Sequence, residues 1–236
     1  MAEGSARPAR DRRSLARWVG KQTVFCLLVA AALFWPSGDT AWLAGWLYVG
    51  VCVAAQVATA AVLLPVSPQL LVDRSGISPG AKGWDIPLAL LVGYSPLFLA
   101  LAAGLEHPAG TSLGLPAWAA AVAILVIALA TGFTLWAMAV NRHFSPVVTI
   151  EPEKGHTVVD RGPYGWVRHP GYVGSLIFAL AAPFLLDSAW AAATAVGVLA
   201  VTALRTALED RALQRELPGY REYAGRVRWR LVPGVW

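Results

Sequence analysis

The chain has 236 residues, of which 57% are hydrophobic and 14% are charged. Soluble globular proteins contain about 45–50% apolar and about 25% charged residues, so this composition excludes a soluble globular domain and a disordered chain. Nineteen Lys and Arg against fourteen Asp and Glu give a net charge of +5. The placement of these charges decides whether they reflect an anionic partner or membrane topology.

Six apolar runs separate the polar connections of the chain. The second, third and fourth reach 20 residues or more, which is the length that a helix needs to cross a bilayer. The last two are shorter and are joined by only two residues, so we expect a tight antiparallel hairpin. The sequence therefore predicts an all-α, polytopic membrane helix bundle with about six transmembrane helices, at residues 18–35, 41–64, 86–105, 117–140, 172–186 and 189–204.

The basic residues favour one orientation. With the N-terminus in the cytosol, the outward connections at residues 36–40, 106–116 and 187–188 contain no Lys or Arg, which satisfies the positive-inside rule. We expect a multi-pass integral membrane protein that retains its first segment as a signal anchor, with both termini in the cytosol. Its membrane is the plasma or inner membrane in a prokaryote and the endoplasmic reticulum in a eukaryote. Topology thus explains the net charge, and we expect no nucleic-acid partner.

Polar residues divide the chain into two regions. Residues 1–140 form an N-terminal four-span membrane region in which polar residues are confined to loops. Residues 141–171 and 205–236 are polar, charged and aromatic, and only the short hairpin separates them. We therefore expect the functional region at 141–236, on the cytosolic side.

The two polar segments each allow a structural and a functional interpretation. The motifs of soluble cofactor enzymes are absent, and the four histidines are spaced too widely to predict a bound metal. The first segment offers Arg168, His169 and two tyrosines, which suit either interfacial anchoring or a polar cofactor. In the second, Arg205 and Glu209 are one helical turn apart and form either a simple ion pair or part of a pocket. Tyr220 and Tyr223 are either packing aromatics or a pocket wall.

The two segments contain five short motifs: Gly162-Pro-Tyr164, Val167-Arg-His-Pro-Gly-Tyr172, Glu209-Asp-Arg-Ala-Leu213, Tyr220-Arg-Glu-Tyr223 and Val227-Arg-Trp-Arg-Leu-Val-Pro-Gly-Val-Trp236. Together these motifs resemble the isoprenylcysteine carboxyl methyltransferase family. The resemblance covers about the last ninety residues of the chain, and the acidic pair reads Glu209-Asp210 where the family has two glutamates.

The resemblance implies a membrane methyltransferase that uses S-adenosyl-L-methionine, with a catalytic methyltransferase region at residues 141–236 and a C-terminal cytosolic cofactor pocket. Its catalytic candidates are Arg205 and Arg168, either of which would bind an anionic acceptor, and Glu209, which would bind a cationic or polar part of the cofactor. Carried over by motif, the residues around the cofactor are Thr149, His156, Thr157, Val158, Val159, Tyr164, His169, Pro170, Gly171, Tyr172 and Glu209.

The acceptor is expected to be a lipophilic or small molecule that enters from the bilayer, in contact with membrane lipids. A carboxylate, as in isoprenylcysteine, is the first expectation, because a thiol or phospholipid amine would have to lose a proton to His169 or Glu209. Two other functions fit the motifs. One is an NADPH-dependent membrane sterol or ene reductase, which shares an Arg-His-Pro-x-Tyr element. The other is a non-catalytic lipid-binding membrane protein. The oligomeric state is left open.

Overall fold

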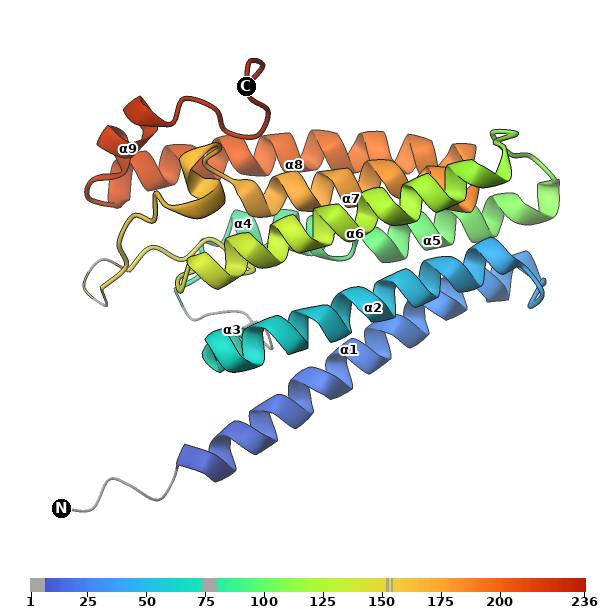
Figure 1. Ribbon diagram of the computed structural model, residues 1–236, viewed down its shortest axis with the longest axis horizontal. Helices are drawn as coiled ribbons and strands as arrows, with labels where there is room; N and C mark the ends of the chain where they lie inside the picture. The colour runs from blue at the N-terminus through green and yellow to red at the C-terminus, as the bar shows by residue number, and fades with distance from the viewer. Residues whose placement is uncertain (1–6, 74–79, 152, 154) are drawn as a thin grey trace.

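The computed structural model describes residues 7–73, 80–151, 153 and 155–236, and these residues form helices and connecting loops without a strand. The predicted all-α class is therefore confirmed. Figure 1 shows the long helices side by side, with the loops after α6 and before α7 gathered at one end together with α9 and the C-terminal tail. We call this the polar end. The helices are α1 (Arg7–Ser37), α2 (Leu43–Val66), α3 (Pro68–Asp73), α4 (Asp85–Gly93), α5 (Ser95–Glu106), α6 (Ala117–Val140), α7 (Pro170–Leu186), α8 (Ala189–Glu216) and α9 (Tyr220–Arg226), with 3-10 turns η1 (His107–Ala109) and η3 (Gly162–Gly165).

Four helical segments are long and apolar enough to cross a membrane: Leu15–Ser37 of α1, and α2, α6 and α8. The bent pair α4 and α5 makes a fifth if it is counted as one broken span. With 17 residues, α7 is a shorter apolar helix. These helices indicate an integral multi-pass membrane protein. The structure supports four or five candidate spans, and the sixth, at α7, stays a prediction.

The third predicted span, at residues 86–105, is not one continuous helix. It breaks at Tyr94, and the axes of the two parts differ by 53°. The physical reason is Pro96 near the start of α5, because proline has no N–H to continue the hydrogen bonds of α4 and its ring crowds the carbonyl group one turn earlier. The bend corrects the prediction and separates α4, at the polar end, from the rest of the span.

Close helix contacts at glycine hold the bundle together. A Cβ atom on Gly174 of α7 would lie 2.7 Å from the carbonyl oxygen of Ala130 in α6. One on Gly104 of α5 would lie 2.4 Å from the carbonyl oxygen of Ala32 in α1. Small residues at such crossings let membrane helices approach closely and gain van der Waals contact. The two contacts fix α7 on α6 and α5 on α1.

The predicted hairpin of α7 and α8 is confirmed, and a buried carboxylate stabilises its turn. Asp187 adopts a left-handed conformation (φ 49°) and Ser188 caps α8 by accepting from the N–H of Ala191. Glu106, 1% exposed at the end of α5, accepts from the Ser188 hydroxyl and from the N–H of Trp190 at 3.0 Å. A carboxylate at a helix N-terminus satisfies free N–H groups and interacts favourably with the helix dipole.

The two polar segments of the sequence meet at the polar end, as predicted. The N–H of Arg168 donates to the carbonyl of Trp229 at 2.9 Å, and the N–H of His169 donates to that of Arg230 at 3.0 Å. The C-terminal tail, residues 227–236, is thereby hydrogen-bonded to the two residues that precede α7.

Replacing Glu106 with Gln tests the turn of the hairpin. We expect Glu106→Gln to lower the free energy of unfolding by about 2 kcal/mol, because it weakens charge-assisted hydrogen bonds at a buried helix N-terminus. Thermal unfolding of the purified protein in detergent measures the effect. Glu222→Gln, at an exposed position of α9, is the control. Equal melting temperatures of the two variants would contradict the proposed capping role.

Candidate functional site

A cavity lies at the polar end between the loop after α6, the start of α7, the end of α8 and α9. About 780 Å³ of space lies within it, and this volume includes open solvent at its mouth. Every residue that the sequence predicted around a cofactor lines this cavity, and so does Arg168. Arg205 is not among the lining residues. The lining residues that the prediction did not name as cofactor contacts are Asn141, His143, Phe144, Ser145, Val147, Val148, Leu213, Leu217, Tyr220 and Tyr223. For Tyr220 and Tyr223 the sequence allows two interpretations, packing aromatics or a pocket wall, and both side chains line the cavity.

The Arg-His-Pro-Gly-Tyr motif forms the start of α7. Pro170 occupies the first turn, where a missing N–H costs nothing, and keeps His169 out of the helical conformation. Gly171 leaves room for Phe144, whose ring would lie 2.6 Å from an added Cβ. The rings of His169 and Tyr172 stack at 5.7 Å. The motif thus presents an imidazole and a phenol ring together at the cavity wall.

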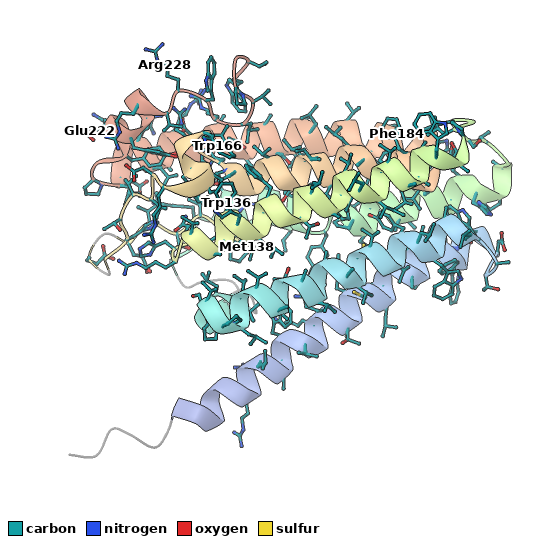
Figure 2. The ribbon with its side chains drawn as sticks, viewed as in Figure 1. Trp136, Met138, Trp166, Phe184, Glu222 and Arg228 are labelled. Atoms are coloured by element: carbon teal, nitrogen blue, oxygen red, sulfur yellow. The ribbon has the colours of Figure 1, made fainter. Side chains whose placement is uncertain are left out.

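The segment before α7 is held against α6 by aromatic contacts. Trp166, which follows η3, lies with its ring centroid 5.3 Å from that of Trp136 and 6.5 Å from that of Phe133. Figure 2 shows Trp136 and Trp166 close together near the polar end. Tyr164, which lies in η3 two residues before Trp166, accepts a hydrogen bond from the side chain of Asn141 at 3.1 Å. These contacts position the η3 side of the cavity.

Glu209 provides a carboxylate in the cavity wall. It lies on α8, lines the cavity and accepts a hydrogen bond from the hydroxyl of Tyr172. Within the described part of the chain it forms no ion pair. Because a carboxylate accepts up to about four hydrogen bonds, Glu209 retains capacity for a cationic or hydrogen-bond-donating ligand.

Asp210, the next residue on α8, is fully buried and makes a different set of contacts. Its carboxylate accepts from Arg168 Nη2 at 3.0 Å and from Arg230 Nε at 2.9 Å. The side chain of Gln214 and the hydroxyl of Tyr220 also donate to it, at 2.8 and 3.2 Å, and His169 Nε2 lies 3.4 Å away. Asp210 therefore joins the start of α7, α8, α9 and the tail. The motif analysis does not predict this role, and the acidic pair itself is the one signal that points to it.

The two arginines predicted as catalytic candidates are both bound within the protein. Besides Asp210, Arg168 donates to the carbonyls of Ala224 and Val227 at 3.3 and 3.1 Å. Arg205 forms a buried, bidentate ion pair with Asp85, in which Nε donates to Oδ1 at 2.7 Å and Nη2 donates to Oδ2 at 2.9 Å. Asp85, rather than Glu209, is therefore the ion-pair partner of Arg205.

Burial keeps the titratable rings of the cavity loops uncharged. The rings of His143 and His156 stack at 4.6 Å, and burial lowers the pKa of both below the usual value, helped by Arg142 beside His143 and by His143 beside His156. Burial raises the pKa of Tyr164 and of Tyr220. At neutral pH these four rings are neutral hydrogen-bonding partners. Among the Asp, Glu, Lys and Arg side chains of the described residues, Arg168, which Asp210 compensates, and Glu209 line the cavity.

Two comparisons with known proteins bear on this site. Residues 121–215 match the isoprenylcysteine carboxyl methyltransferase family. A stretch of 97 residues is 30% identical to the lamin-B receptor of Drosophila melanogaster, and it covers 39% of this chain and 13% of that receptor.

The family match spans the helices and loops that build most of the cavity. It begins in α6 and ends in α8, and it includes the Arg-His-Pro-Gly-Tyr motif and both residues of the acidic pair. Residues 121–215 of this chain therefore form a domain of the isoprenylcysteine carboxyl methyltransferase family.

Proposed function

We propose that the protein is an integral membrane methyltransferase that uses S-adenosyl-L-methionine and methylates a lipophilic or small acceptor. The observation that carries this proposal is the charge of the cavity within the family domain. Glu209 faces the cavity without an ion-pair partner among the described residues, and Arg168 is compensated by Asp210. Such a site favours a cofactor with positive charge. S-adenosyl-L-methionine has a sulfonium and an ammonium group, and the sulfonium activates the methyl carbon that is transferred.

The residues of the cavity fit this cofactor. Glu209 would accept hydrogen bonds from its ammonium group. The hydroxyl of Thr149 is buried and has no hydrogen-bond partner within the described residues, although buried polar groups are nearly always paired. It is therefore available to a polar group of the ligand. The neutral imidazoles of His143 and His156 line the same loop without adding repulsion toward a cation.

Methyl transfer requires alignment of donor and acceptor more than acid–base chemistry. The reaction is an in-line displacement in which the acceptor forms a bond to the methyl carbon as the bond from carbon to sulfur breaks. Orientation alone supplies much of the rate gain. A carboxylate acceptor needs no base. For a thiol or an amine, His169 or Glu209 would have to accept the proton.

We propose a carboxylate as the acceptor group, in a molecule similar to isoprenylcysteine. Arg205 would bind it, since Asp85 uses its Nε and Nη2 and Nη1 has no hydrogen-bond partner in the described structure. The lipophilic part would enter from the bilayer between the helices. In this proposal the polar end and both termini face the cytosol, and the membrane is the plasma or inner membrane of a prokaryote or the endoplasmic reticulum of a eukaryote.

Calorimetric titration with S-adenosylhomocysteine and with NADPH separates the two enzyme classes. We expect the purified protein to bind S-adenosylhomocysteine and not NADPH, because the phosphates of NADPH would need uncompensated cations. Binding of NADPH alone would refute the methyltransferase proposal in favour of a reductase. Binding of neither ligand would favour a non-catalytic lipid-binding protein.

Replacing Glu209 with Gln tests the proposed cofactor contact. We expect about a tenfold weaker affinity for S-adenosylhomocysteine, because a charge-assisted hydrogen bond to its ammonium becomes a neutral one. Glu216→Gln is the matched control, since Glu216 lies on the same helix and pairs with Lys82 outside the cavity lining. An unchanged dissociation constant in Glu209→Gln would show that this carboxylate does not contact the cofactor.

The chemical stability of the product identifies the methylated atom. Membranes that contain the protein are incubated with cofactor labelled in its methyl group, and the lipid extract is then treated with base. We expect the label to be released as volatile methanol, because a methyl ester hydrolyses in base whereas an S-methyl or N-methyl group does not. Label that stays in the extract would point to a thiol or an amine as the acceptor group.

A further inference from the structure

The cavity wall after α6 is held from behind by the segment that begins α4. Val148, which lines the cavity, has both backbone groups bound there: its N–H donates to Asp85 Oδ2 at 2.6 Å, and its carbonyl accepts from the N–H of Lys82 at 3.0 Å. Pro146, two residues earlier, accepts from Arg205 Nη2 at 2.7 Å. Residues 146–148 of the cavity loop are thus hydrogen-bonded both to the segment that begins α4 and to α8.

Asp85 is the common partner in this arrangement. Its side chain is fully buried, and its two oxygens bind the guanidinium of Arg205 and the N–H of Val148 together. The position of Arg205, and through it that of the Pro146 carbonyl, depends on the same carboxylate. Asp85 itself does not line the cavity and lies outside the matched family segment at residues 121–215.

We infer that Asp85 is a positioning residue for the cofactor cavity: it holds Val147, Val148 and Thr149 in the place where they form the wall. The inference rests on the proposed function, because the ligand of this wall is taken to be the cofactor. Val147 and Thr149 line the cavity on either side of Val148, and Thr149 has the unpaired buried hydroxyl. A shift of Val148 would move all three, so the effect of Asp85 reaches the ligand through the backbone.

Loss of the buried Asp85–Arg205 ion pair could also weaken binding simply by destabilising the fold. The variants must therefore separate a loss of stability from a loss of wall positioning. Removing Asp85 alone leaves the charge of Arg205 buried and uncompensated, which destabilises a fold strongly. Replacing both partners with apolar side chains of similar size avoids that penalty and is often neutral for stability. The double variant still lacks the acceptor for the Val148 N–H and the donor to Pro146. It therefore separates the loss of these backbone contacts from the penalty of an unpaired buried charge.

The test measures melting temperature and affinity for S-adenosylhomocysteine in the purified full chain, for Asp85→Asn and for Asp85→Leu with Arg205→Met. We expect the double variant to melt close to the wild type and to bind S-adenosylhomocysteine about tenfold more weakly or worse. Asp85→Asn should also bind more weakly, and its melting temperature should fall. Glu216→Gln removes an exposed ion pair between the same two segments and should leave the affinity unchanged.

Each outcome decides the inference. Wild-type affinity in a double variant that folds would overturn it and leave the proposed function intact. An equally large loss of affinity in Glu216→Gln would also overturn it, because the loss of any contact between these two segments would then weaken binding and Asp85 would have no special role. Absence of S-adenosylhomocysteine binding in the wild type would overturn the proposed function and, with it, the inference. If Asp85→Asn does not fold, the double variant alone decides the question.

Discussion

The ion pair between Asp210 and Arg168 is the interaction on which the site depends. Asp210 is fully buried, and Arg168, Arg230, Gln214 and Tyr220 all donate to it. These donors come from the start of α7, the end of α8, α9 and the tail, so one carboxylate joins segments that would otherwise diverge beyond the helical bundle. Burial of charge is costly unless each charge is paired and hydrogen-bonded. The network meets that condition, and the cavity walls made by these segments are fixed relative to each other.

The neighbouring residue Glu209 shows why the acidic pair carries two functions. Consecutive residues on an α-helix point about 100° apart, so adjacent side chains do not face the same surroundings. Asp210 turns into the protein and is compensated by arginines, whereas Glu209 turns to the cavity and accepts a hydrogen bond from the Tyr172 hydroxyl. One carboxylate organises the protein and the other remains available to a ligand. The pair is therefore better described as a positioning residue beside a binding residue than as a double acidic site.

Much of the site could be predicted from the sequence because its parts are local. The motif from Arg168 to Tyr172 sets its own geometry through Pro170, and motif resemblance placed the residues that line the cavity. The helix break at Tyr94 was missed although the Ser95-Pro96 pair signals it. The partner of Arg205 could not be found in this way: Asp85 lies 120 residues away, while the i, i+4 rule pointed to Glu209. Pairings between distant segments depend on how the helices pack, which local patterns do not encode.

The charge pattern at the polar end also explains why the first half of the chain belongs to the site. Near the end of an apolar helix, an ionised side chain without a partner is expensive, so such residues are normally paired or functional. Arg205 is paired by Asp85 of α4, and Arg168 by Asp210. Glu209 is the cavity-lining carboxylate that forms no ion pair in the described structure. A cation that binds beside it would complete the pattern. In the proposed function, the helices before residue 121 therefore do more than anchor the domain in a membrane: α4 neutralises Arg205, and Glu209 would be the charge that a cationic ligand compensates.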